Sequence, residues 1–223
     1  MFNYVLNPGL LEKDKPASSN DAFFFSRLMQ FVPQPMRPLD DFSYVFFDFE
    51  TTGLDFERDR VIEVGALKIV NGEVVDRFEA LTGTDIVITD LIQSLTGITS
   101  EMLANKPKFE EIFAEFIQFC RGSVMVAHNA EFDISMLSAA AKRIGVQLRW
   151  PVFCTLKMSR KILPNLGRHN LDTLAQHFNL KFEARHRSIG DIQVTKSVFD
   201  RLLELDPLEP ETLNDMKDYL IAM

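Results

Sequence analysis

The feature that most constrains this chain is a pair of acidic residues inside an apolar strand. Residues 44–49 read YVFFDF, which predicts a buried β-strand, and Glu50 follows directly. Asp48 and Glu50 are two positions apart, so their side chains project from the same face of that strand. Two carboxylates on a buried face repel each other and lose hydration, and a bound cation is the usual remedy. We interpret the strand as part of a metal site; a solvated strand end that exposes both acids is the alternative.

The rest of the chain predicts an α/β fold. Apolar runs at 61–70 and 73–81 flank Asn71-Gly72, a strong signal for a β-hairpin. A meander followed by alternating helices and strands predicts a mixed five-stranded sheet with helices on both faces. The later elements are helices expected at 108–120, 131–145, 170–180 and 189–203, and strands expected at 123–129 and 151–156.

Two extensions flank the main domain, which we place at residues 42–203. Residues 1–41 are expected to hold a short aromatic helix at 21–31 and a proline-rich linker, and residues 204–223 an acidic helical tail. Both extensions carry more apolar surface than a detached helix tolerates in water. We therefore expect them to pack on the domain, on each other or across a homodimer.

Composition narrows the class of protein. Hydrophobic residues make up 46% of the chain and charged residues 25%, as in globular proteins. The sequence has no apolar run that would span a membrane and no signal-peptide pattern, and Cys120 and Cys154 lie in apolar surroundings. We expect a cytoplasmic protein with reduced cysteines. The net charge of −8 suits a nucleic-acid partner only if something else, such as metal ions, supplies positive charge.

Two further motifs place acids near the starts of helices. Asp133 closes HNAEFD at 128–133, and Asp191 follows His186 by five positions. Each motif alone has an ordinary explanation in helix capping or surface polarity. Together with the acidic strand they supply what phosphodiester hydrolysis with two divalent ions needs, namely several carboxylates and a base. Oxygen ligands without cysteine favour Mg²⁺ or Mn²⁺.

In this order, DFETTGL, HNAEFD and H-x4-D resemble the three motifs of the DEDDh exonucleases, the DnaQ-like family of the proofreading epsilon subunit of bacterial DNA polymerase III. LTGIT at 95–99 adds to the similarity, which runs from about 42 to 203. The resemblance implies a ribonuclease-H-like fold and a 3′→5′ exonuclease that releases nucleoside 5′-monophosphates from DNA. It also implies His186 as general base and a set of metal-site acids, which are Asp48, Glu50, Asp133 and Asp191.

The resemblance also suggests substrate-binding residues beside the acids. Backbone groups after the acidic strand would reach the terminal sugar, and apolar side chains would wedge beside or stack on the terminal base. For Ile98 and Phe132, plain core packing is the alternative. The candidates are Thr51, Thr52, Gly53, Leu54, Ile98, Asn129 and Phe132.

Several readings of the function stay open at this point. An RNA 3′→5′ exonuclease of the ribonuclease T or oligoribonuclease type is the nearest rival, because a single contact to the 2′-hydroxyl decides sugar preference. A non-catalytic binding module with the same fold is the rival from another class, although the intact acids and His186 argue against it. The expected partners are a single-stranded DNA 3′ end and a DNA polymerase or another replication or repair protein. A typical epsilon subunit has no such N-terminal segment, so a free-standing exonuclease is equally tenable.

Overall fold

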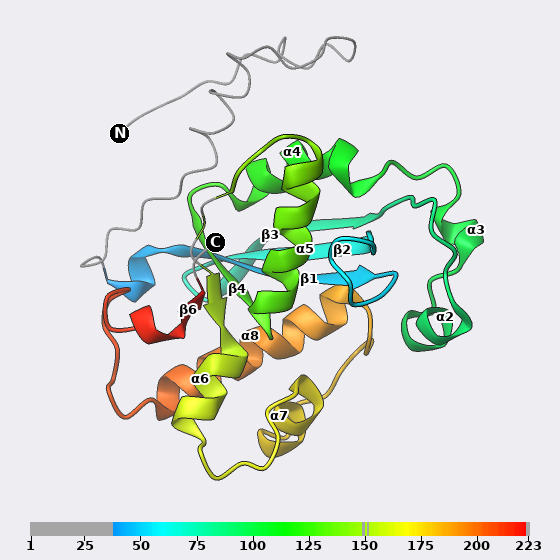
Figure 1. The fold of residues 1–223 in the computed structure, drawn as a ribbon. Helices are drawn as coiled ribbons and strands as arrows, with labels where there is room; N and C mark the ends of the chain where they lie inside the picture. The colour runs from blue at the N-terminus through cyan, green and yellow to red at the C-terminus, as the bar shows by residue number, and fades with distance from the viewer. Residues whose placement is uncertain (1–37, 149, 151, 222–223) are drawn as a thin grey trace.

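The acidic strand lies in the middle of a six-stranded sheet whose order is β3-β2-β1-β4-β5-β6 (Figure 1). The structure is a computed structural model, and it describes residues 38–148, 150 and 152–221. β1 pairs with β4 in parallel and β4 with β5 in parallel, while β2, β3 and β6 run antiparallel to their neighbours. The strands are β1 (Ser43–Thr51), β2 (Val61–Val70), β3 (Glu73–Leu81), β4 (Ser123–Ala127), β5 (Val152–Cys154) and β6 (Leu220–Ile221).

Helices cover both faces of this sheet (Figure 1). α4 and α5 pack on one face, and α6, α7 and α8 pack on the other. The helices are α2 (Asp90–Thr96), α3 (Ser100–Leu103), α4 (Phe109–Cys120), α5 (Ala130–Arg143), α6 (Thr155–Ile162), α7 (Leu171–His177) and α8 (Ser188–Leu205), with 3₁₀ turns η2 (Leu39–Asp41) and η3 (Lys217–Tyr219). No helix in the described part of the chain is both long enough and apolar enough to cross a membrane.

The alternation of side chains along β1 explains how it serves both faces. Val45, Phe47 and Phe49 are buried in the core beneath α4 and α5. Phe46 points the other way, and its ring centroid lies 5.5 Å from that of Phe199 on α8. Asp48 belongs to the same face as Phe46, because successive residues of a strand alternate. The carboxylates of β1 therefore face α8.

The expected mixed sheet with helices on both faces is confirmed, but it has six strands where we expected five. The additional strand, β6, comes from the tail, whose expected helix is wrong. The tail instead forms turns, η3 and β6, and buries Leu213, Met216 and Tyr219 against the domain. The Tyr219 hydroxyl donates to Asp206 Oδ2 at 2.6 Å, and these buried contacts outweigh helical spacing.

Other expectations fare differently. The hairpin and the four expected helices form near the expected positions, although α7 covers only Leu171–His177 of the expected 170–180, and α2, α3 and α6 were missed. Cys120 and Cys154 are free and buried, as expected. The aromatic helix expected at 21–31 lies outside the described residues, as does most of the linker. The division into three segments stays a prediction.

The start of α8 lies unusually close to β2. Gly65 pairs with Asp48 in the sheet, and a Cβ at Gly65 would lie 2.4 Å from Ser188 Oγ and 2.7 Å from Ser188 Cβ. A Cβ at Gly190 would lie 1.8 Å from the carbonyl oxygen of Ala184, in the preceding loop. Since no real Cβ tolerates these distances, both glycines are needed to bring the first turn of α8 onto the sheet. Asp191 lies in that turn.

We expect Gly65→Ala to push the start of α8 away from β2. The added methyl overpacks the contact, so the free energy of unfolding should fall by about 1–3 kcal/mol in urea denaturation. Ser188→Gly in the same chain removes both clashing atoms and should restore most of this stability. Gly167→Ala is the matched control, because a Cβ there meets no atom within 4 Å. Equal stability of Gly65→Ala and Gly167→Ala would contradict the close approach.

Candidate active site

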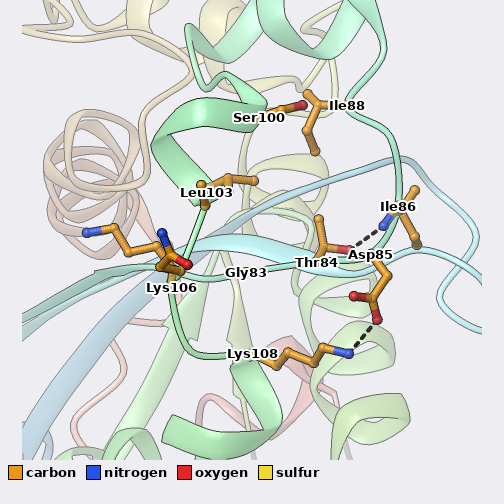
Figure 2. A pocket seen from close by; sticks show the side chains of 11 residues that line it. Gly83, Thr84, Asp85, Ile86, Ile88, Ser100, Leu103, Lys106 and Lys108 are labelled. Atoms are coloured by element: carbon orange, nitrogen blue, oxygen red, sulfur yellow. Dashed lines mark hydrogen bonds and ion pairs between the residues drawn. The ribbon is translucent and has the colours of Figure 1, made fainter.

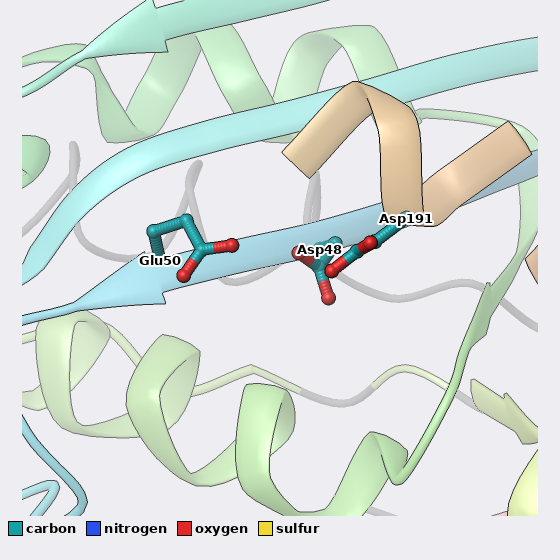
Figure 3. Close-up of side chains that lie close together, drawn as sticks. All are labelled: Asp48, Glu50 and Asp191. Atoms are coloured by element: carbon teal, nitrogen blue, oxygen red, sulfur yellow. The ribbon is translucent and has the colours of Figure 1, made fainter. Parts of the chain in front are cut away.

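Three carboxylates meet between β1 and α8. Asp48 and Glu50 come from β1, Asp191 comes from the first turn of α8, and Figure 3 shows their side chains converging. One oxygen of each lies within 4.8 Å of an oxygen of the other two. Asp48 and Glu50 are half-buried and Asp191 is buried. The sequence placed two of these acids on one strand face, and the fold adds the third.

The two oxygens of Asp191 have different surroundings. Oδ2 accepts a hydrogen bond from Arg185 Nη1, and the two groups form an ion pair. Oδ1 is buried and has no hydrogen-bond partner among the described residues. A buried carboxylate oxygen without a donor is costly unless a cation completes it. The donor set, three carboxylates with one unpartnered buried oxygen, therefore fits a hard divalent cation.

Burial and mutual repulsion make these acids reluctant to ionise. Burial, with added repulsion from Asp191 and Glu63, raises the pKa of Glu50 to about 7. Burial raises the pKa of Asp191 to about 6 even though Arg185 opposes the shift. Burial and the charges of Asp133, Glu50 and Asp191 hold the pKa of Asp48 well above its usual range. A divalent cation would reverse these shifts, because it favours the charged form of each carboxylate.

Asp133 lies beside this group without joining its three mutually close oxygens. It is buried in the first turn of α5, and its Oδ1 accepts a hydrogen bond of 3.3 Å from the backbone N–H of Phe49, between Asp48 and Glu50 in the chain. Burial raises the pKa of Asp133 to about 8, against the lowering effect of that hydrogen bond. Asp133 therefore lies next to β1, as expected, but its Oδ1 accepts a hydrogen bond from the strand backbone.

His186 lies in the loop before α8, outside the group of three acids. Its φ of 57° is left-handed, a conformation in which histidine is enriched among non-glycine residues. The side chain is half-buried, and burial and the charge of Arg185 lower its pKa. The imidazole is therefore neutral over a wider pH range than a free histidine.

The residues after the acids build a loop. Thr51 Oγ1 donates to the carbonyl oxygen of Gly53 at 2.7 Å, and Thr52 Oγ1 donates to Asp59 Oδ1 at 2.7 Å. Asp59 Oδ2 also accepts from the backbone N–H of Asp55, and a Cβ at Gly53 would lie 2.5 Å from this oxygen. Both threonine hydroxyls thus hold the loop between β1 and β2 in shape.

The apolar substrate candidates divide into exposed and packed side chains. Leu54 is 83% exposed and free to contact a ligand. Ile98 is wholly buried with Ile62, and this contradicts a place for it beside a substrate base. Phe132 is half-buried and packs on the main core, while Asn129 is exposed at the start of α5 with a φ of 57°.

Four charged residues outside the predicted set of site residues form ion pairs around the group. Glu63 is 1% exposed, faces Glu50 across the strands and pairs with Arg187. Arg185 joins Asp172 of α7 to Asp191. The signal for Glu63 was present, since it is an acid within a ten-residue apolar strand. Asp172 looks like an ordinary acid in the first turn of a helix, and no sequence pattern distinguishes it.

A cavity of about 220 Å³ lies elsewhere, between the segment after β3 and the segment around α3 (Figure 2). Its lining includes Gly83, Thr84 and Lys106, and an ion pair of Lys108 with Asp85 lies at its rim. Asp48, Glu50, Asp133 and Asp191 do not line it. The three mutually close carboxylates thus lie outside this cavity.

The fold and the acidic centre define an α/β domain of the kind that nucleases use. The chain belongs to the exonuclease family, because the family model described as Exonuclease, of the RNase T type, matches residues 45–199. The family resemblance seen in the sequence is thus confirmed, and the enzyme class is exonuclease.

Relatives and solved structures agree with this family. A DNA polymerase III PolC-type protein of Caldanaerobacter subterraneus is 41% identical over 161 residues, which is 72% of this chain and 12% of the relative. One from Halalkalibacterium halodurans is 38% identical over 80% of this chain and 13% of its own length. The chain thus spans about an eighth of these relatives.

Two solved structures share the fold. Exonuclease X in complex with 5′ overhanging duplex DNA has a TM-score of 0.61 at 23% identity, over 78% of this chain and 98% of that one. E. coli exonuclease I in complex with a dT13 oligonucleotide has a TM-score of 0.63 at 15% identity, over 74% of this chain and 42% of that one. At these identities the likeness concerns the fold alone.

The raised pKa values predict how stability depends on pH when divalent ions are removed. The folded protein holds protons on Glu50, Asp133 and Asp191 that the unfolded chain has already released, so stability falls as the pH rises from about 4 towards 8. In EDTA we expect a Tm several degrees lower at pH 8 than at pH 5. Mg²⁺ or Mn²⁺ should raise the Tm more at pH 8, because ions bind the deprotonated acids.

Thermal unfolding of the wild type and of Glu50→Gln isolates this contribution. The variant cannot titrate at position 50, so its Tm in EDTA should fall less with pH and should rise less on adding Mg²⁺. A wild-type Tm that climbs steadily from pH 5 to pH 8 in EDTA, in parallel with the variant, would contradict the raised pKa of Glu50.

Proposed function

We propose that this chain is a 3′→5′ exonuclease that removes nucleoside 5′-monophosphates from DNA 3′ ends with two divalent ions, Mg²⁺ or Mn²⁺. The observation that carries the proposal is the group of Asp48, Glu50 and Asp191, with an unpartnered buried oxygen, inside a chain of the exonuclease family. Paired divalent ions are a general solution for phosphodiester hydrolysis. The relatives named as DNA polymerases favour DNA over RNA as substrate and a proofreading or repair role.

Each residue has a distinct task in this proposal. Asp48, Glu50 and Asp191 hold the ions, and Asp133 supports them from α5. When bound, the ions acidify a water molecule and stabilise negative charge at the phosphate. An imidazole nitrogen of neutral His186 accepts a proton from the attacking water. The water oxygen bonds to phosphorus, and the bond to the 3′-oxygen breaks. That oxygen takes up a proton from solvent, and His186 returns its proton to solvent.

Contacts to the substrate beyond the phosphate are expected from the loop between β1 and β2. Leu54 is highly exposed there, four residues after Glu50, and can pack against a terminal base without reading its identity. Such contacts suit single-stranded ends, in which bases are unstacked. A polymerase or another replication or repair protein as partner, a homodimer and a cytoplasmic location are further predictions of the same proposal.

Replacing Asp48 tests the acidic centre. Asp48→Asn removes a ligand, so cleavage of 3′-end single-stranded DNA should become undetectable with Mg²⁺ or Mn²⁺. The fold should survive, and the Tm in EDTA should stay equal or rise, because a repelling carboxylate is gone. Asp76→Asn is the control, since this exposed acid lies on β3. Near-normal cleavage by Asp48→Asn would exclude a metal site at these acids.

One assay measures both the direction of degradation and the preference for DNA or RNA. Wild-type protein is incubated with DNA and RNA single strands labelled at the 5′ end, with Mg²⁺, Mn²⁺ or EDTA. We expect a ladder of DNA products that shorten from the 3′ end, release of 5′-monophosphates and no reaction in EDTA. Faster shortening of RNA would favour the ribonuclease T or oligoribonuclease type. Tight DNA binding without any cleavage would favour a binding module.

Replacing His186 tests the general base. His186→Ala should lower the single-turnover rate by about 10²–10⁴-fold while Mn²⁺ affinity stays unchanged. Burial and the charge of Arg185 lower the pKa of His186, so the wild-type rate at saturating Mg²⁺ should rise with pH and level off at a lower pH than a free histidine would give, and the variant should lose this rise. His177→Ala, an exposed histidine on α7, is the control. An unchanged rate and pH profile in His186→Ala would assign the base to another group.

A further inference from the structure

We propose that Arg185, anchored by Asp172, is a positioning residue that holds Asp191 Oδ2, so that Oδ1 is the oxygen of Asp191 left to bind a cation together with Asp48 and Glu50. The inference rests on the proposed function, because it concerns how a ligand of the divalent cation is oriented. It adds two residues, Arg185 and Asp172, that lie outside the sequence motifs which suggested the site. Neither residue offers a ligand atom to the group of three acids.

The guanidinium of Arg185 is held on two sides. Nε lies 2.8 Å from Asp172 Oδ1 and Nη2 lies 2.9 Å from Asp172 Oδ2, which is a bidentate pair of two parallel hydrogen bonds. The guanidinium carbon lies 4.9 Å from the ring centroid of Phe182. This leaves Nη1 to pair with Asp191 Oδ2. A planar fork fixed by a carboxylate and by an aromatic ring has little freedom to turn.

The surroundings of Asp191 show what this fork achieves. A free carboxylate rotates and offers either oxygen, whereas Arg185 occupies Oδ2 and leaves Oδ1 buried without a partner in the described part of the chain. The side chain of Asp191 is 7% exposed and Oδ1 is fully buried, so bulk solvent has little access to this carboxylate. Asp191 is therefore presented through one oxygen. In metal sites, hydrogen-bonding partners of ligands commonly fix ligand orientation in this way.

Charge and orientation make opposite predictions for this arginine. As a positive charge beside a cation site, Arg185 repels the cation, so its removal should tighten binding if charge were all that mattered. As an orienting group it preorganises Asp191, so its removal should weaken binding. Lysine at position 185 keeps the charge but cannot donate to Asp172 and Asp191 as a planar fork. The two substitutions together separate the two effects.

The experiment measures Mn²⁺ affinity of the full chain by electron paramagnetic resonance and by titration calorimetry, with no nucleic acid present. We expect Arg185→Lys and Arg185→Gln each to lose about 10–100-fold in Mn²⁺ affinity. Arg201→Gln removes the same charge from an exposed pair with Glu204 further along α8 and should bind Mn²⁺ as the wild type does. Wild-type affinity in Arg185→Lys, with tighter binding in Arg185→Gln, would overturn the positioning role.

Asp172→Asn gives a second test that keeps the arginine. We expect it to weaken Mn²⁺ binding alone but to have no further effect in the Arg185→Gln chain, because Asp172 acts through Arg185. Additive losses would show that Asp172 acts on the cation directly and would contradict the inference. Thermal unfolding in EDTA checks that each variant folds. If Arg185→Gln does not fold, the same comparison is made with Asp172→Asn in the Arg185→Lys chain. Absence of Mn²⁺ binding by wild-type protein would instead contradict the proposed function.

Discussion

The attachment of the first turn of α8 to β2 is the contact on which the acidic centre depends. Glu63, buried in β2, accepts hydrogen bonds from Arg187 Nε at 3.0 Å and from the backbone N–H of Ser188 at 2.9 Å. The carboxylate thus binds a side chain and an otherwise unpaired N–H at the positive end of the helix. Gly65, two residues on, leaves the room that this approach needs. Asp191 follows Ser188 by three residues, so its place opposite Asp48 is set by this attachment.

The acids at this end of the sheet differ in how many hydrogen bonds and ion pairs neutralise them. This difference distinguishes the acid that anchors the fold from the acids that could bind a cation. Glu63 has both oxygens bonded and acts as a structural anchor. Asp191 has one oxygen paired with Arg185 and one unpartnered. Within the described residues, Asp48 and Glu50 form no ion pair with a basic side chain, and their pKa values are raised. Glu63 therefore stabilises the fold, whereas the carboxylates that lack a basic partner are gathered at the site where a cation can bind.

The sequence predicted most of the sheet and the acids, because these depend on local patterns. Alternation along YVFFDF placed Asp48 and Glu50 on one face, and Asn71-Gly72 located the hairpin. What failed depends on contacts between distant segments. Periodicity assigned the tail to a helix, yet burial of Tyr219 and pairing with β5 turned its end into a strand. Ile98 lies within LTGIT, which resembles family sequences, and its complete burial favours core packing, the alternative that the sequence left open.

The loop before α8 shows how two tasks are fulfilled by adjacent residues. A left-handed φ at His186 turns the chain between two arginines, so that Arg187 reaches Glu63 while Arg185 reaches Asp172 and Asp191. Arg185 pairs with an acid of the centre, and Arg187 pairs with the buried acid that anchors the helix carrying it. His186 itself takes part in neither ion pair; it is half-buried, and its pKa is lowered. The backbone of His186 is thus fixed on both sides by paired arginines, and such a fixed backbone would suit the general base that we propose.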